Sequence, residues 1–399
     1  MDAKEFGDHV RHLRRTRGYS QAGLAARIGR SESWVSQVER GVFTVDKVTV
    51  LTALAKELEV KPDQLVDGPM LPALVEDDEL PIAGVREHFT SVAVAQETYP
   101  GTDEDYFQLR QDVWAAYQAY QAAEYEELCA ALPGILRLAD RIQGPGYIPA
   151  YALAAKMLAK LGDTNTSYVA ADRCAVAASR IPSDNARGLA TYEVAQALSR
   201  LGRIEDGEQL AVGTAEELQR RPYHQIRSLA SVIGCLWISG ALMAAKRGDR
   251  GAAYQRLRLA SRMADVVGQD LNLAWTEFGP TRVALHRVRV AAELQDLSEA
   301  THAADQVRVQ SLAPELRRRR ADLHLTLAWA HATRRNDPQA VLQLTEVHRV
   351  APQLVKYEVG TRRLIRSLVA RGGTGPFVHD LTREVSLTFP DRLEGEVEE

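Results

Sequence analysis

Hydrophobic positions along the chain recur at helical spacing, and no segment alternates convincingly with the two-residue period of a strand. Near the N-terminus, four groups of apolar residues predict four short helices, and Pro62 with Leu65 suggests a short fifth one. The inward-facing residues of the four helices are Phe6, Val10 and Leu13, then Leu24, Ala25 and Ile28, then Val35 and Val38, and finally Val48, Leu51, Leu54, Ala55 and Leu58.

Polar residues and glycines mark where these helices begin and end. Gly18 ends the first helix, and Ser20 is placed to cap the second. Gly29 supplies a turn, Ser31 caps the third helix, and Gly41 ends it. A tight glycine turn between the second and third helices predicts a helix-turn-helix module.

The segments "LRRTRGYSQAGLAARIGRSESWVSQVERG" and "LTALAKELEV" resemble the phage-repressor-like, xenobiotic-response-element (XRE) family of helix-turn-helix domains across residues 6–66. The resemblance implies that the helix from Ser31 to Arg40 enters the major groove of DNA. It also implies an internal ion pair between Arg14 and Glu39, which would tie the first helix to the third.

The polar side chains of this module divide into two groups of expected DNA contacts. An amide can pair with adenine and a carboxylate can accept from cytosine, whereas a helix N-terminus suits a phosphate. Trp34 either covers a thymine methyl group or packs on the second helix. We assign Glu32, Ser33 and Gln37 to base edges and Gln21, Ser31, Arg40 and Thr44 to phosphates, with Ser36 as a further polar residue on the same face.

A mixed acidic and proline-containing segment, "VDGPMLPALVEDDELP", predicts a linker after the module. Beyond it, a small or polar turn followed by an Ala-rich helix recurs, and this predicts stacked helical hairpins. The expected fold is all-α, with residues 1–66 as the DNA-binding domain, 67–103 as linker, 104–371 as an α-solenoid and 372–399 as a tail. The turn markers are Gly162, Gly202, Gly248, Asp296 and Asp337, at intervals of 40, 46, 48 and 41 residues.

These intervals exceed the 34-residue tetratricopeptide period, so the repeats are degenerate. The region nevertheless resembles tetratricopeptide-like regulatory domains. Joined to an XRE-type module, it is similar to actinobacterial regulators of this architecture and, more distantly, to peptide-sensing quorum regulators of Gram-positive bacteria. The resemblance implies a transcription factor whose DNA binding is set by something held in the helical array.

Within the array, "NLAWTEFGPTRVALHRVRVAAEL" resembles the FGPT-type stretch of related regulators. Gly279 and Pro280 interrupt a run otherwise suited to one long helix, because proline bends or starts a helix. A cationic, aromatic-lined patch here could hold a peptide or a small carboxylate. Alternatively, Pro280 only ends a hairpin and the charges face water. The candidate ligand-binding residues are Trp275, Phe278, Thr281, Arg282, His286 and Arg289.

Composition adds few constraints. The 399 residues carry a formal net charge of −4, which argues against a non-specific nucleic-acid coat. Cys129, Cys174 and Cys235 lack metal-binding or disulfide spacing, so we expect buried free thiols and no metal or cofactor. The "RRRR" run at 317–320 is expected to be a solvated helix face rather than a second DNA contact.

We expect a cytoplasmic protein. The N-terminus has no apolar leader segment, and we judge that no stretch approaches the roughly 20 uncharged residues of a membrane span.

The leading hypothesis is a homodimeric transcription regulator that binds a pseudo-palindromic double-stranded operator and responds to a peptide or small-molecule effector. An alternative is an antitoxin-like or scaffold protein, in which the array binds a protein partner. An enzyme is the weakest hypothesis, because no catalytic constellation is visible in the sequence.

Overall fold

The computed structural model describes residues 3–42, 48–58, 60, 81–90, 100–142, 146–307 and 316–371. The chain divides into two compact units, one formed by Met1–Glu76 with Ser386–Glu399 and the other by Asp77–Val385. The described parts of both units are helical, and the only β-type pairing in them is an isolated bridge in the second unit.

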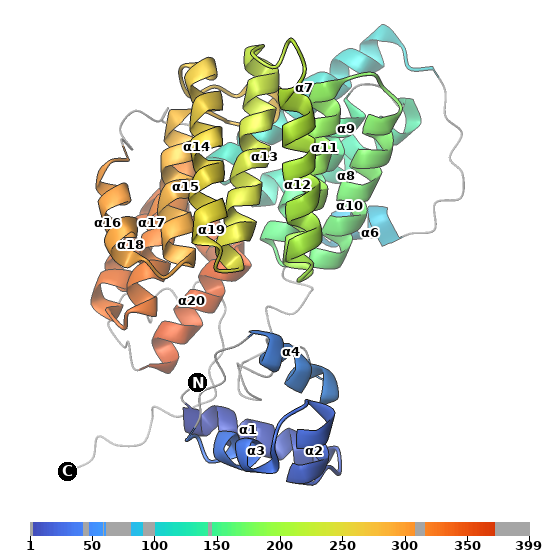
Figure 1. Cartoon of the computed structure of the whole chain (residues 1–399). Coiled ribbons are helices and arrows are strands. Elements are labelled where there is room, and N and C mark those ends of the chain that lie inside the picture. Colours follow the sequence, from blue (N-terminus) through green and yellow to red (C-terminus); the bar gives the residue numbers. More distant parts are fainter. Residues whose placement is uncertain are drawn as a thin grey trace, which may run out of the picture. The chain divides into compact units, whose positions relative to one another are not determined.

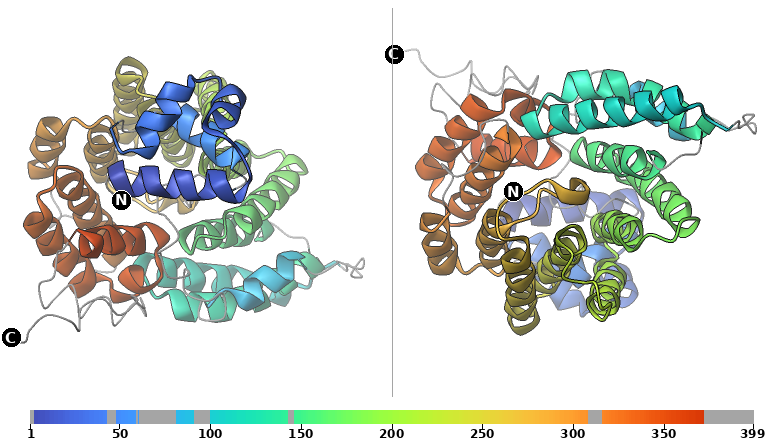
Figure 2. Two further views of the ribbon diagram at one scale, coloured as in Figure 1. Left: turned by 90° about the horizontal axis from the view of Figure 1, so that it is seen from below. Right: turned by 90° about the horizontal axis from the view of Figure 1, so that it is seen from above.

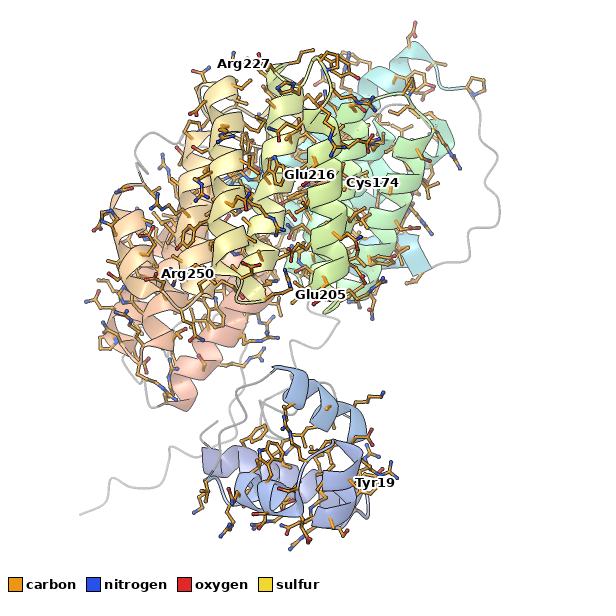
Figure 3. All side chains as sticks on the ribbon, in the orientation of Figure 1. Tyr19, Cys174, Glu205, Glu216, Arg227 and Arg250 are labelled. Atoms are coloured by element: carbon orange, nitrogen blue, oxygen red, sulfur yellow. The ribbon has the colours of Figure 1, made fainter. Side chains whose placement is uncertain are left out.

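The first unit contains four described helices packed on a small apolar core (Figure 1). Phe6, Val10, Leu24 and Val38 are among the buried residues that join the helices. Tyr19, labelled in Figure 3, packs on this core, and the guanidinium of Arg27 lies over its ring. The predicted fifth helix around Pro62 and Leu65 lies outside the described residues. The helices are α1 (Ala3–Thr16), α2 (Gln21–Arg27), α3 (Glu32–Glu39) and α4 (Val48–Glu57).

The second unit is an array of paired antiparallel helices (Figure 1). The prediction of an all-α fold with an N-terminal helix-turn-helix and a repeat-like helical region is therefore confirmed. The helices are α6 (Ala83–Thr90), α7 (Asp103–Ala122), α8 (Tyr125–Ile142), α9 (Tyr147–Lys160), α10 (Thr164–Ser179), α11 (Asp184–Arg200), α12 (Ile204–Gln219), α13 (Arg227–Lys246), α14 (Arg250–Val267), α15 (Pro280–Glu293), α16 (Leu297–Asp305), α17 (Arg317–Thr333), α18 (Asp337–Val350), α19 (Pro352–Tyr357) and α20 (Val359–Ala370).

Each hairpin from α7/α8 to α17/α18 turns at one residue with a left-handed backbone. A following aspartate caps the next helix in three of them, because its carboxylate accepts an N–H of the first turn. At these three turns the left-handed residue and the capping aspartate are adjacent, as Gly162–Asp163, Gly248–Asp249 and Gln295–Asp296. The left-handed turn residues are Ala123, Gly162, Gly202, Gly248, Gln295 and Arg335.

The array closes on itself, so that its first hairpin contacts its last helices. Figure 2, which shows the molecule from below and from above, places the helices of the first hairpin beside the C-terminal helices; α7 contacts α17 and α8 contacts α19. The side-chain oxygen of Gln353 in α19 accepts from the backbone N–H groups of Tyr125 (2.5 Å) and Glu126 (3.0 Å) at the start of α8. Arg317 in α17 pairs with Glu124. Because these contacts join distant parts of the sequence, the interior is enclosed by helices from the whole unit.

Helix α13 corrects the expectation about apolar stretches. It is the one helix in the described residues that is long and apolar enough to cross a membrane, with an 18-residue window of mean hydropathy 1.8. However, 94% of that window is buried inside the array, where α13 packs against α11, α12, α14 and α15. Its apolar character belongs to the centre of a protein core.

Two further expectations concern the segment after the first unit and the cysteines. Part of the predicted linker is helix α6, which packs on α8 and α10; the domain boundaries as drawn from the sequence stay predictions. Cys129, Cys174 and Cys235 are buried free thiols, as predicted, and burial raises the pKa of the Cys129 thiol to about 12. No group of three or more His, Cys, Asp or Glu side chains among the described residues could hold a metal ion.

Candidate nucleic-acid interface and array interior

Side-chain caps define the starts of α2 and α3, and a glycine turn joins the two helices. The hydroxyl of Ser20 accepts from the N–H of Gly23 (2.9 Å), and that of Ser31 accepts from the N–H of Trp34 (3.2 Å). Gly29, between the two helices, has φ of 64°, a conformation that glycine adopts without strain. Both predicted caps and the predicted turn are confirmed.

Helix α3 has one buried face and one polar face. Val35, Val38 and Glu39 are almost completely buried, whereas Glu32, Ser33 and Arg40 are exposed. Polar groups at its N-terminal end are the ones that can reach base edges when such a helix enters a groove. The polar face holds the predicted DNA contacts Glu32, Ser33, Ser36, Gln37 and Arg40, with Ser31 at the cap; Thr44 lies outside the described residues.

Side chains on this face make hydrogen bonds within α3 and its C-cap. The amide of Gln37 donates to the Ser33 hydroxyl one turn earlier at 3.2 Å. The Arg40 guanidinium donates to the carbonyl oxygen of Ser36 at 3.3 Å. Ser33 and Gln37, both assigned to bases, thus form one hydrogen-bonded polar group.

Trp34 packs against the core of the first unit and is only partly exposed. The guanidinium of Arg30 lies 5.6 Å from the centre of its ring. This geometry corresponds to the packing alternative; contact between the ring and a thymine methyl group stays a prediction.

An ion-pair network joins α1, α2 and α3. The Arg14 guanidinium contacts both carboxylate oxygens of Glu39, at 2.5 and 3.1 Å, so the predicted pair is confirmed. Gln21, predicted to contact phosphate, donates its side-chain amide to the same carboxylate at 2.7 Å. Burial would raise the pKa of Glu39, but the hydrogen bonds from Arg14 and Gln21 and the nearby positive charges lower it. The side chain of Gln21 therefore supports α3 from within the module.

A second group of predicted residues lies in the connection between α14 and α15, which we call the inner loop (residues 269–279). It is closed by the bridge between Leu271 and Phe278, where the N–H of Leu271 donates to the Phe278 carbonyl at 3.2 Å. Asp270 accepts from the N–H of Thr281 at 3.0 Å. Pro280 is the first residue of α15, so the predicted interruption of the helix is confirmed.

The inner loop has an unusual backbone. Ala274, Trp275 and Glu277 all have positive φ, at 48°, 60° and 50°. For a residue with a side chain, this conformation costs about 1–3 kcal/mol and persists only when the surroundings hold it. Three such residues within four positions indicate that the contacts of the loop outweigh considerable local strain.

The side chains of the loop contact helices on different sides of the array. The Trp275 ring stacks on the buried Tyr117 ring of α7, with centroids 4.4 Å apart. The hydroxyl of Thr276 lies 2.5 Å from that of Ser231 in α13. The fully buried Phe278 ring occupies the space beside a glycine of α13. The loop therefore fills part of the interior of the array.

The acidic residue of the loop meets a buried cationic site. The carboxylate of Glu277 accepts from Arg318 (2.7 Å) and Arg319 (2.6 Å), consecutive residues of α17. Burial alone would raise the pKa of Glu277, but the charges of Arg318, Arg319 and Arg282 outweigh it and lower the pKa. The three arginines therefore favour the ionised form of Glu277.

The start of α15 completes this interior. Arg282 is buried; it donates to the backbone carbonyl of Thr276 and, at 3.1 Å, to the Tyr192 hydroxyl of α11. Half-buried His286 is within 2.8 Å of the Arg282 carbonyl, and burial and nearby arginine charges lower its pKa well below the usual value. Arg289 is exposed. Thr281, Arg282 and His286 in the first turns of α15 thus lie beside Trp275 and Phe278 of the inner loop, while Arg289 faces solvent.

The expectation of a solvated "RRRR" face is wrong for its two central members. Arg318 and Arg319 are 8% and 5% exposed and bind Glu277. Four consecutive helical residues point in directions about 100° apart, so in a packed array some must face inward. The burial of some of the four arginines could therefore be predicted from the sequence. The identity of their buried partner, some 40 residues earlier in the chain, could not.

Comparisons with known proteins bear mainly on the first unit. Residues 5–67 match a family model described as a helix-turn-helix domain. No curated protein matches the chain significantly. One solved structure to which the chain is similar is the crystal structure of Bacillus thuringiensis PlcR in complex with the peptide PapR7 and DNA. The similarity has a TM-score of 0.38 and 13% identity, and covers 84% of this chain and 99% of that one.

Proposed function

We propose that this protein is a sequence-specific DNA-binding transcriptional regulator. The observation that carries the proposal is the capped helix–turn–helix at α2 and α3, inside the segment that matches the helix-turn-helix family model. Its XRE type is part of the proposal. Helix α3 has a polar outward face at the end that would enter a major groove. We assign base contacts to Glu32, Ser33 and Gln37 and phosphate contacts to Gln21, Ser31, Arg40 and Thr44.

The experiment is selection of binding sites from random double-stranded DNA, followed by affinity measurements at fixed salt. Replacing Gln37 with alanine should reduce discrimination at one base position by about 1–3 kcal/mol, because an amide pairs with adenine at two points. Replacing Arg40 with alanine should weaken binding to all sequences alike and lower the salt slope by about 1. Equal loss on specific and random DNA for the Gln37 variant would contradict the assignment.

We further propose that the array controls DNA binding through a peptide or small-molecule effector. What supports this is the convergence of aromatic, polar and charged side chains from α7, α13, α15 and α17 on the inner loop, in the region predicted from sequence. Such a site has the mixture of apolar surface and few charged groups that ligand sites share. The candidate residues are Trp275, Phe278, Thr281, Arg282, His286 and Arg289.

The regulator is proposed to act as a homodimer on a pseudo-palindromic operator. The reason is the size of α3, whose eight residues span only a few base pairs. Two modules on adjacent half-sites combine their binding energies and gain the specificity that one lacks.

A further inference from the structure

The inner loop contacts the array in the way that a bound peptide contacts its receptor. Its four consecutive side chains each have a separate recognition partner, contributed by three different helices. One aromatic ring stacks on another, and a hydroxyl forms a hydrogen bond with a hydroxyl. A carboxylate accepts hydrogen bonds from two guanidiniums, and a second aromatic ring fills the space beside a glycine. The pairs are Trp275 with Tyr117, Thr276 with Ser231, Glu277 with Arg318 and Arg319, and Phe278 with Gly234.

The charge of this interior exceeds what the loop supplies. Arg282, Arg318 and Arg319 are all buried around the one carboxylate of Glu277, and the other acidic partner of Arg318, Asp322, is partly exposed. Burial, together with the neighbouring arginine charges, keeps the pKa of Arg319 below its usual value even though Glu277 opposes the shift. The two guanidiniums in α17 therefore form an anion-binding site that carries more positive charge than the carboxylate of Glu277 neutralises.

The loop is also held in a conformation that it would not adopt alone. Ala274, Trp275 and Glu277 leave the left-handed region when the loop is released, so release relieves their strain. Asn272 is exposed and the residues up to Trp275 are half-buried, so the first part of the loop borders solvent, whereas Thr276, Glu277 and Phe278 are buried. A competitor can therefore approach from this side, and the strain lowers the affinity that it needs.

We infer that Arg318 and Arg319 form a carboxylate-binding site whose resident ligand is the chain's own Glu277, and that an acidic, aromatic peptide binds there by displacing the inner loop. The inference rests on the proposed effector role of the array. It names the effector class, a short peptide with an acidic residue between aromatic or apolar ones. Displacement would remove the contacts that the loop makes with α7, α13 and α17. Peptide binding would thereby change how firmly these helices are held together in the closed array.

The test uses the full-length chain and a fluorescent peptide with the sequence of residues 270–278, DLNLAWTEF, blocked at both ends. A matched peptide carries Gln in place of the Glu. Trp275→Ala removes the stacking contact without leaving a guanidinium unpaired, and Glu277→Gln removes the tethered carboxylate. Because a tethered ligand competes at high effective concentration, each variant should bind the peptide about tenfold more tightly than the wild type.

Specificity for the carboxylate is tested in the Trp275→Ala background. The Gln peptide should bind about tenfold more weakly, because a charged hydrogen bond to two guanidiniums is lost. Adding Arg319→Gln should abolish the preference for the Glu peptide. Millimolar acetate or free glutamate tests whether a small carboxylic acid can bind in place of a peptide. Strong competition with the labelled peptide would mean that a small acid suffices, and would overturn the assignment of the effector as a peptide.

Wild-type protein provides a test that does not depend on any variant folding. Excess Glu peptide should speed hydrogen exchange of residues 269–279, whereas the Gln peptide should not. Unchanged exchange, or equal binding of both peptides, overturns the inference and makes the Glu277 contacts purely structural. DNA binding measured on the same samples separates the two proposals. If the DNA-binding proposal fails, operator binding is absent while the peptide still binds. If the peptide inference fails, operator binding is present while the peptide does not bind.

Discussion

At the scale of single residues, buried carboxylates account for the most specific contacts in both units. Glu39 and Glu277 each accept from arginines on a different helix, and both have lowered pKa values because those cations outweigh the effect of burial. A buried pair contributes little net stability, but losing one partner leaves an uncompensated charge. Each carboxylate therefore fixes how its helices fit together.

Replacing Glu39 with glutamine should destabilise the first unit by about 3–5 kcal/mol, because Arg14 stays buried without a counter-charge. Hydrogen exchange of residues 3–42 in the full chain, followed with increasing urea, measures the effect. A glutamine at Glu57 is the control, since that carboxylate pairs with an exposed Arg27 at 3.4 Å and should change stability by less than about 1 kcal/mol.

The stability difference between the wild type and the Glu39→Gln variant should depend on pH. A carboxylate with a lowered folded-state pKa contributes stability above its unfolded value of 4.5, and that contribution is lost as pH falls through the folded value. The difference between wild type and the Glu39 variant should therefore be constant at neutral pH and shrink below pH 4.5. A difference that stays constant into strong acid would contradict an ionised Glu39.

Residue-scale prediction from sequence succeeded where the signal was local. The caps Ser20 and Ser31 and the turn at Gly29 follow from backbone preferences within a few residues, and all three are confirmed. The partner of Arg318 and Arg319 is 41 or 42 residues away, in a loop whose course depends on the whole array. No local preference determines such a pairing.

At the scale of elements, the close approach of the inner loop to α13 depends on Gly234. A methyl group at this position would lie 2.0 Å from the ring of Phe278, which is fully buried and cannot swing away. The glycine is tolerated in the middle of α13 because the ring occupies the volume that a side chain would fill. Packing thus outweighs helix propensity at this position.

Replacing Gly234 with alanine should destabilise the second unit by about 1–3 kcal/mol, the usual cost of overpacking, although alanine is the better helix former. The matched control is alanine at Gly213, an exposed position in α12 with nothing within 4 Å of the added methyl group. That change should stabilise the same unit by up to about 1 kcal/mol. Urea unfolding followed by circular dichroism compares the two, and a stabilised Gly234 variant would contradict the packing of Phe278.

The hairpins were the most predictable elements, because their signal lies in the turns. Gly162, Gly202 and Gly248 each end a helix with positive φ, and Asp163 and Asp249 cap the next one. The inner loop was predictable only as an interruption at Pro280. Its inward path depends on contacts with α7, α13 and α17, which the sequence does not place near one another.

At the scale of the whole molecule, composition and periodicity were enough to predict two kinds of helical unit. A short capped module and a repeat array differ in helix length and in turn spacing, and both differences are visible in the chain. Closure of the array was not predictable, because it depends on contacts such as those of Gln353 with the start of α8, 227 and 228 positions apart.

The last prediction is the homodimer, and it follows from the limited reach of one recognition helix. Helix α3 has eight residues, so a single module distinguishes few base pairs and binds specific DNA only slightly better than random DNA. Two modules on half-sites about 34 Å apart combine their contacts. Light scattering should therefore give about twice the chain mass of 44.1 kDa, and footprinting should protect two related half-sites. A monomer both free and on DNA, with one half-site protected, would rule out the dimer.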